Sequence, residues 1–338
     1  MARKKKKEAL TVEDILEKFR DAETYWKPLH GQMERGHKIF NLKLEVEAPK
    51  GYNVIDPGTG NTIVMTAADH IAGDAPKVQV PEAGLSKRAQ ERSEALEKGF
   101  EAALYRFERA QNEIVQRTLA INGLWSGMLV SQGPLFDPDA WGLEPVESEY
   151  EDAEAYTSDK DEYEIGKRLN WPFLWKAVDP RYVYPDPGTT GREWVIVSYE
   201  RTAGSIKAQW SSWDMRLPGA SDQDKPLPAG SKIQWLEFWS KAKRAYLVGH
   251  VGSGSQSSFW GGAKEVDLIR DHRYGKPPFQ IRSAGYGNDS GLPEERFRSI
   301  FFAAESLIPA EIRAYSHRDA LIRNTAWTQM LTLIGSGF

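Results

Sequence analysis

Two aspartates beside aromatic residues are the first place in this sequence where catalytic chemistry could be expected. Asp179 and Asp186 lie in a stretch rich in tyrosine and proline. Two carboxylates near aromatic rings can serve as the acid and base of a glycosidase. Each aspartate, however, precedes a proline, and Asp186-Pro187-Gly188 is typical of a turn, in which Pro fixes φ and Gly accepts positive φ. The pattern favours turns at both positions, and catalysis stays as the alternative.

The other residues that could carry chemistry lack the spacing that each reaction requires. The chain has no Walker-type phosphate loop, no Gly-x-Ser-x-Gly elbow and no pair of histidines spaced as in a zinc protease. Gly285, Gly287 and Gly291 do not match a dinucleotide fingerprint. The absence of cysteine excludes disulfides and thiolate metal sites. We therefore predict no catalytic residue, no cofactor and no metal, and we expect a protein that is not an enzyme.

Composition indicates a folded chain of two or three packed units. Of its 338 residues, 40% are hydrophobic and 27% are charged, as in ordinary folded proteins. The net charge of -4 excludes a nucleic-acid-binding polycation, and no apolar run is long enough to cross a bilayer. The basic run Lys4, Lys5, Lys6 and Lys7 is interpreted as a disordered tail, with an arm that touches DNA as the alternative.

Helices are expected at both ends and in the first half. Thr11 with Asp14 resembles a capping box, and the following apolar residues recur at helical spacing, with Pro28 expected to kink or end the helix. A second helix is predicted over 86–122. A third is predicted from Pro293 onward, with a kink at Pro309. The apolar stripe of the first helix comprises Ile15, Phe19, Ala22, Trp26, Leu29 and Met33.

The middle of the chain is expected to be rich in β-structure. A short strand is predicted over 62–65, a strand-like piece over 123–133, and a β-hairpin from 233–239 and 245–248. The tract 139–164 contains eleven carboxylates and one lysine, and we expect it to be an exposed loop or insertion. Helices and strands in separate stretches define an α+β fold class.

Tryptophans are concentrated in the predicted strands of this middle region. Trp235, Trp239 and Trp260 could form a platform on which sugars or bases stack. Tryptophan in strands is more often a packing residue or an anchor at an interface, and we favour that interpretation.

An ordered set of segments resembles the portal proteins of tailed double-stranded-DNA bacteriophages. The stretch 178–188 followed by 192–197 resembles the family's Val-x-Pro and Asp-Pro segment, which leads into a strand that starts at Trp. The stretch 233–239 resembles its Glu-x-Trp strand, and 272–279 resembles its Tyr-Gly-x-x-Pro-Phe strand. The likeness covers most of residues 12–330 and consists of the order and residue character of the segments more than of an exact motif. The acidic tract and the Gly/Ser loop at 252–258 depart from it.

The resemblance implies a portal fold, with a mainly helical wing and stem and a small β-containing clip. The parts expected from it are a disordered basic tail at 1–11, a wing at 12–200 with the acidic insertion, a stem helix and linker at 201–227, a clip at 228–290, and a second stem helix at 291–338. The crown is expected beyond residue 338.

The resemblance also implies a function and its partners. The chain would form a homo-oligomeric ring, commonly of twelve subunits, at one capsid vertex of the virion after assembly in the host cytoplasm. Double-stranded DNA would pass through the channel without sequence preference, and the ring would dock the terminase, the tail adaptor and the major capsid protein. The candidates for the subunit interface or clip are Trp235, Trp239, Tyr246 and Trp260. The candidates for the stem are Arg296, Phe297, Phe301 and Arg313.

Two alternatives remain open at the level of sequence. The first is a head–tail adaptor or another virion structural protein, which would share the oligomeric character but lack a clip between two helices. The second is a carbohydrate-active enzyme that uses Asp179 or Asp186. Replacing both aspartates with Asn would abolish turnover in the enzyme and weaken only folding or assembly in the portal protein.

Overall fold

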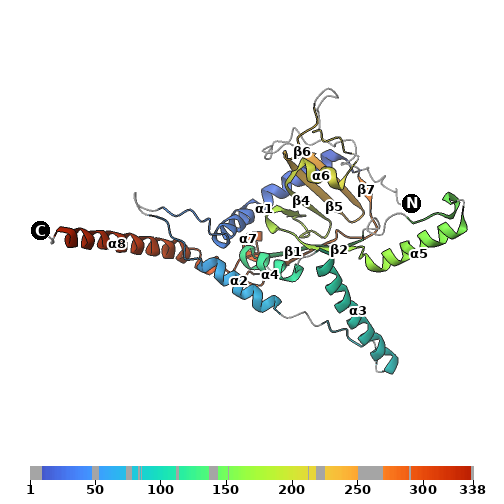
Figure 1. The fold of residues 1–338 in the computed structure, drawn as a ribbon, viewed down its shortest axis with the longest axis horizontal. Coiled ribbons are helices and arrows are strands. Elements are labelled where there is room, and N and C mark those ends of the chain that lie inside the picture. The colour runs from blue at the N-terminus through green and yellow to red at the C-terminus, as the bar shows by residue number, and fades with distance from the viewer. Residues whose placement is uncertain are drawn as a thin grey trace, which may run out of the picture. The chain divides into compact units, whose positions relative to one another are not determined.

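A computed structural model of the chain contains both helices and sheets, which confirms the α+β class (Figure 1). It describes residues 10–47, 53–73, 78–82, 84, 86–111, 114–136, 144–150, 152–211, 213–217, 225–249, 269–288 and 291–335. These residues form two compact units. We call the described parts of 10–31 and 178–281 the sheet unit, and those of 32–177 and 282–335 the helix unit.

The elements follow one another along the chain with their helices and strands interleaved. The helices are α1 (Val12–Phe40), α2 (Thr59–Ala72), α3 (Lys87–Gln111), α4 (Val115–Ser126), α5 (Ala153–Leu169), α6 (Ala203–Gln209), α7 (Pro293–Arg296) and α8 (Leu307–Gly335). The strands are β1 (Met128–Phe136), β2 (Phe173–Ala177), β3 (Val183–Pro185), β4 (Trp194–Thr202), β5 (Lys232–Ser240), β6 (Lys243–Gly249), β7 (Arg270–Asp271) and β8 (Phe279–Ser283).

The sheet unit is built on an antiparallel sheet with the strand order β3-β4-β5-β6-β7. β4 pairs with β5 along its whole length, from Trp194 opposite Ser240 to Thr202 opposite Lys232. β5 and β6 form the predicted hairpin, which is therefore confirmed. Its tight turn is held by the Ser240 hydroxyl, which accepts a hydrogen bond from the Lys243 amide at 3.0 Å.

The first face of this sheet is covered by the N-terminal half of α1 (Figure 1). Ile15 and Leu16 of the helix pack against Ile196, Leu236 and Phe238 of the strands. Side chains alternate between the faces of a strand, so only the even-numbered residues of β5 meet α1. The predicted apolar stripe of the helix is confirmed by this packing.

The start of α1 agrees with the sequence-based prediction, whereas its end lies beyond the predicted stop. The capping box is confirmed, because the Asp14 carboxylate accepts from the Thr11 amide at 2.8 Å and the Thr11 hydroxyl accepts from the Asp14 amide at 3.2 Å. These hydrogen bonds from Thr11 lower the pKa of Asp14. The helix continues through Pro28 to Phe40, so the prediction that Pro28 could end it is wrong.

The second face of the sheet is covered by α6 and the segment after it. Ala203 and Ile206 of α6, together with Trp213, pack on Ile233 and Trp235 of β5. Burial on both faces makes these strands a sandwiched core.

The helix unit contains β1 and β2 of a second sheet, whose strand order is β2-β1-β8, together with the second half of α1 and the helices α2 to α5, α7 and α8. The chain turns from α4 into β1 at Gly127, whose φ of 81° is the left-handed value that favours glycine at a helix end. Gly36 of α1 lies directly against the Trp125 carbonyl, where a Cβ atom would be 2.3 Å from that oxygen. Close approach of the two helices therefore requires glycine at this position.

Two expectations for the first half are corrected by the helix unit. The predicted strand at 62–65 is part of α2, because Gly60, Val64 and Ala68 repeat at a spacing of four and are all buried. The predicted long helix 86–122 corresponds to two helices, α3 and α4, and the predicted strand-like piece 123–133 begins inside α4.

The acidic tract 139–164, expected to be an exposed loop or insertion, is partly helical. Its second half belongs to α5, where Asp152 caps the helix by accepting from the Glu154 amide at 3.0 Å. Negative side chains near a helix N-terminus are stabilised by the helix dipole, so an acidic stretch is compatible with a helix start. Residues 137–143 lie outside the described residues.

The predicted helix from Pro293 is interrupted. α7 ends at Arg296, and α8 begins only at Leu307, with a 3-10 turn (Phe302–Ala304) between them. Pro309 lies in the first turn of α8, where its missing N–H is not required, so it starts this helix rather than kinking it.

The compact units do not follow the predicted wing and clip boundaries. The predicted wing, 12–200, contributes to both units. Its last strand, β4, shares one continuous sheet with β5 and β6 of the predicted clip. The predicted stem helix and linker at 201–227 contains α6, which ends at Gln209 and packs on that sheet. A two-turn helix buried in this way is not a free-standing stem element.

Candidate functional site

Aromatic and arginine side chains cover the second face of the sheet unit beyond α6. We call this set the aromatic–arginine face. Two of its tryptophans, Trp235 and Trp239, lie at odd-numbered positions of β5, which places them on one side of the strand. The members are Tyr199, Arg201, Trp210, Trp235, Glu237, Trp239, Arg244 and Tyr246.

The rings of this face contact one another continuously. Trp235 and Tyr246 stack with their centroids 5.5 Å apart, and Trp210 lies 4.7 Å from Trp235. The Arg201 guanidinium lies 5.0 Å from the Trp235 ring, and that of Arg244 lies 5.7 Å from Trp239. Such cation–π contacts add attraction between side chains that already pack together.

A buried carboxylate lies at the centre of the face. Glu237 accepts hydrogen bonds from the Trp235 indole at 3.1 Å and from the Tyr199 hydroxyl at 3.3 Å. Burial, and then the charge of Glu237, raise the pKa of both Tyr199 and Tyr246. The two phenols therefore stay protonated, and the carboxylate is satisfied by neutral donors.

The candidates for the subunit interface or clip differ in burial. Trp235 and Trp239 are fully buried inside the sheet unit, where their indoles are core residues, in agreement with the packing interpretation of these tryptophans. Tyr246 is only partly buried. Trp260 lies outside the described residues. The stacking platform for sugars or bases is also not supported, because the faces of the buried tryptophans are occupied by protein side chains.

One residue of the aromatic–arginine face that the sequence analysis did not select, Glu237, could have been found from the sequence. Glu237 stands between Trp235 and Trp239 in the same alternating pattern, which predicts that it shares their face. The partners from β4, α6 and β6 could not be identified in this way, because only the register of three strands brings them together.

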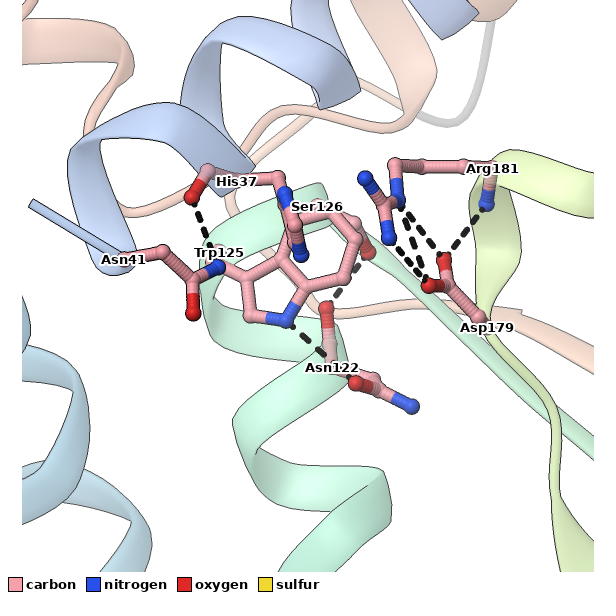
Figure 2. Close-up of polar contacts among 7 residues, drawn as sticks. All are labelled: His37, Asn41, Asn122, Trp125, Ser126, Asp179 and Arg181. Atoms are coloured by element: carbon pink, nitrogen blue, oxygen red, sulfur yellow. Dashed lines mark hydrogen bonds and ion pairs between the residues drawn. The ribbon is translucent and has the colours of Figure 1, made fainter. Parts of the chain in front are cut away.

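The two aspartates weighed as a catalytic pair both act in turns. Figure 2 shows Asp179 facing Arg181, with oxygen–nitrogen distances of 2.7 and 3.2 Å, while its Oδ1 also accepts from the Arg181 amide at 3.0 Å. Asp186 accepts from the Gly188 amide at 3.1 Å and from the Thr189 hydroxyl at 2.5 Å. The predicted turn chemistry is confirmed at both positions.

A histidine near these turns is held neutral by burial. His30 of α1 bonds to the Val183 carbonyl at 3.2 Å and meets the Tyr184 ring at 4.8 Å between centroids. Burial lowers the pKa of His30 to about 4 and raises the pKa of Tyr184 to about 12. Neighbouring Trp26 donates its indole N–H to the Pro185 carbonyl at 2.8 Å. These contacts fix α1 to β3 within the sheet unit.

A second group of polar contacts lies at the junction of α4 and β1 in the helix unit (Figure 2). The Ser126 hydroxyl is shared by the carbonyls of Asn122 at 2.5 Å and Met128 at 2.9 Å. The Trp125 indole donates to the Asn122 side chain at 3.3 Å, and its ring meets His37 at 5.3 Å. The group stabilises the change from helix to strand.

The predicted stem residues are divided between the core and the surface of the helix unit. Phe297 and Phe301 are buried and line a small pocket with Gly36, which has room for about one water molecule. The Arg296 guanidinium lies 5.2 Å from the Phe297 ring. Arg313 is exposed on α8. The four residues thus do not share one helix face.

Large apolar side chains remain exposed on the helices of the helix unit. Leu96 and Phe100 of α3 are 43% and 52% exposed. Leu321 and Ile322 of α8 are 66% and 57% exposed. Burial on α8 is confined to its first part, up to Ser316, among the described side chains that end at 325. Leu96 and Phe100 are four residues apart and share one face of α3, whereas Leu321 and Ile322 are adjacent on α8 and do not form a stripe.

The described part of the chain offers few features of a catalytic or metal centre. No three His, Cys, Asp or Glu side chains gather there in a way that could hold a metal ion. Nor does any described helix combine the length and apolar character needed to cross a bilayer. Lys4, Lys5, Lys6 and Lys7 lie outside the described residues.

Comparison with known proteins adds no family. No protein-family model matches the chain, and no curated protein matches it.

Proposed function

We propose that this chain is the portal subunit of a tailed double-stranded-DNA bacteriophage. Copies of it would close into a ring at one vertex of the capsid, and genomic DNA would pass through the ring during packaging and ejection. The same ring would dock the terminase and later the tail adaptor. The chain would have a structural rather than an enzymatic role.

The observation that carries the proposal is the set of exposed large apolar side chains on α3 and α8. A soluble monomer rarely leaves Leu96 with Phe100, or Leu321 with Ile322, exposed on neighbouring positions of long helices. A ring subunit needs surfaces of this kind on its sides, because each copy contacts a neighbour through two different patches. Self-association through these helices explains why the helix unit does not bury them.

The ordered likeness between 178 and 279 gives the proposal its specificity. The Asp-Pro turns of this stretch, the strand that starts at Trp194 and the strand around Trp235 belong to one sheet. The segments that carry the resemblance are therefore structural neighbours in one unit. Such agreement between sequence order and packing is expected where a resemblance reflects a common fold.

Self-association of the purified chain is the first test. Light scattering should give a discrete mass that is a multiple of the subunit, with about twelve subunits as the expectation from the resemblance. A monodisperse monomer over a wide range of concentrations would contradict the proposal.

A surface variant tests whether α3 makes the contact. Leu96→Gln with Phe100→Gln should reduce the assembly to smaller species and leave the helix content unchanged, because both side chains are exposed in the subunit. The matched control is Lys98→Gln with Glu101→Gln, which changes two exposed polar residues on the same helix. Equal assembly of both variants would exclude α3 from the interface.

The geometry gives less support to a carbohydrate-active enzyme. Both oxygens of each carboxylate already accept hydrogen bonds, at Asp179 from Arg181 and at Asp186 from Gly188 and Thr189. Asp179→Asn with Asp186→Asn should therefore weaken folding or assembly. Loss of glycan hydrolysis in this variant would instead favour the enzyme. An oligomer without a central channel would favour a head–tail adaptor or another virion structural protein.

A further inference from the structure

One end of the sheet in the sheet unit carries a concentration of positive charge. The β5–β6 turn, β7 with the loop after it, and the residues before β4 meet there. The Lys241 amine reaches Glu193 at 2.5 Å, and the His272 amide donates to the Ala242 carbonyl at 2.8 Å. We call this set the hairpin-end surface: Arg192, Lys241, Lys243, Arg244, Arg270, Arg273 and Lys276.

The carboxylates at this end neutralise only two of the seven basic side chains. Glu193 pairs with Lys241, and Asp271 pairs with Lys243 at 3.3 Å. Within the described residues, no carboxylate forms an ion pair with the other five members of the surface. The surface therefore keeps a strong positive charge on a chain whose net charge is -4.

Two arginines in this surface are placed directly opposite each other. Arg244 of β6 and Arg270 of β7 are Cα partners in the antiparallel register. Like charges at directly opposed positions destabilise a strand pair. The Arg244 guanidinium is partly stabilised by the Trp239 and Tyr246 rings, at 5.7 and 5.9 Å, but these rings are neutral. An external anion between the arginines would remove the repulsion.

The type of anion follows from the side chains. Four of the seven residues are arginines, and a guanidinium binds phosphate oxygens through two parallel hydrogen bonds. Several such groups on one surface match a polymer of phosphates better than a single small anion. The buried Trp239 ring packs against His272, so it is not available to stack on unpaired bases. Contact with the backbone of a duplex fits this surface.

We infer that the hairpin-end surface binds the phosphate backbone of double-stranded DNA without sequence preference. The inference rests on the proposed portal function, and it assigns a place on the subunit to the DNA that such a protein would pass. Seven cations, two of them neutralised within the subunit, would give contact that is weak and strongly salt-dependent. Weak contact is compatible with DNA that must slide.

The test uses the full chain and a fluorescent duplex of about 30 base pairs, with binding followed by anisotropy over a series of salt concentrations. Arg270→Gln, Arg273→Gln and Lys276→Gln together should lower the affinity at least tenfold at low salt. The slope of log affinity against log salt should fall by about two to three, since each phosphate contact contributes roughly 0.9.

The matched control removes the same charge from another part of the chain. Arg88→Gln, Arg92→Gln and Lys98→Gln replace three exposed basic residues of α3, and this variant should keep its affinity within about twofold. Equal weakening by both variants would overturn the inference, because the effect would then be one of net charge. So would an assembly defect of the hairpin-end variant with unchanged DNA affinity, which would assign the surface to an acidic segment of another subunit.

The same samples separate this inference from the portal proposal. Electron microscopy of each preparation records whether rings form. Rings whose DNA affinity is insensitive to the hairpin-end variant would overturn only the inference. A monomer that binds duplex through the hairpin-end surface would overturn the portal function and leave the DNA site in place.

Discussion

The sheet unit buries large aromatic side chains on its central strand β5, whereas the helix unit leaves several large apolar side chains of α3 and α8 exposed. In the sheet unit, α1 covers one face, and α6 with Trp213 covers part of the other. In the helix unit, α8 is packed only up to Ser316 among its described side chains. The difference shows that the strands of the sheet unit form a closed core, while α3 and α8 keep apolar side chains on the surface, which the proposed ring would use for association.

The largest effect on stability is expected at Trp235. Its indole is fully buried between Trp210 and Tyr246, so Trp235→Ala leaves a cavity and should cost about 3–5 kcal/mol of unfolding free energy. Urea denaturation followed by far-UV circular dichroism measures this. Tyr105→Ala on α3, where the side chain is exposed, is the control and should cost less than about 0.5 kcal/mol. Similar costs for the two variants would remove the contrast between the units.

A pH-dependent contribution of somewhat smaller size is expected from His30. Burial holds its pKa at about 4 in the folded chain, whereas the ordinary pKa of histidine is 6.5. Between pH 4 and pH 6.5, the unfolded chain binds a proton at His30 that the folded chain does not bind. The contribution of neutral His30 to the unfolding free energy is therefore complete above about pH 6.5 and is lost as the pH falls towards 4. The unfolding free energy falls by about 3 kcal/mol over this range, because each unit of difference between the two pKa values is worth roughly 1.4 kcal/mol.

The variant His30→Gln isolates this contribution. Its unfolding free energy should fall less than that of the parent chain between about pH 7.5 and pH 4, because the glutamine does not titrate. The carboxylates titrate in both proteins and cancel in the comparison. Parallel pH profiles would show that His30 is not buried as described.

The buried carboxylate of the aromatic–arginine face should have a moderate effect. Glu237→Leu removes the acceptor of the Trp235 indole and the Tyr199 hydroxyl, and each orphaned donor costs about 1–3 kcal/mol. Glu237→Gln keeps an acceptor and should cost clearly less. Equal destabilisation by the two variants would assign the role to charge rather than to hydrogen bonding. Urea midpoints decide between these outcomes.

The smallest effect is expected on the exposed part of α8. Ile322→Ala should change the unfolding free energy by less than about 0.5 kcal/mol, because its side chain is 57% exposed. Ile312→Ala on the same helix is the positive control, since its side chain is fully buried and its truncation should cost about 2–5 kcal/mol. A large cost for Ile322→Ala in a sample verified as monomeric would mean that the subunit itself packs this stretch.

Elements with a clear period and a terminal signal could be predicted from the sequence. The capping box of Thr11 and Asp14 and the apolar stripe of α1 depend only on neighbouring residues, and so does the β5–β6 hairpin. The turns at Asp179 and Asp186 were found for the same reason.

The sequence did not predict the elements whose state depends on distant packing. The β-branched run at 62–65 suggested a strand, but burial of Val64 and Ala68 in the helix unit favours α2. Pro309 was compatible with a kink or a helix start, and the buried Phe297 and Phe301 require the chain to turn before α8. Tertiary context decided both cases.

Of the candidate site, the sequence identified residue types but not their surroundings. Trp235 and Trp239 stood out by composition, yet their burial depends on α6 and on the strand register. The hairpin-end surface is formed by segments that are distant in sequence, from Arg192 to Lys276, and each segment alone carries an ordinary number of charges. Only the pairing of β4 to β7 brings them to one end of the sheet.

Electron microscopy of the purified full-length protein addresses the central claim most directly. If copies of this chain associate side by side through the exposed helices of the helix unit, two-dimensional class averages should show a closed ring with a central channel wide enough for duplex DNA. Single compact particles without a channel, at concentrations where the chain is folded, would contradict the account.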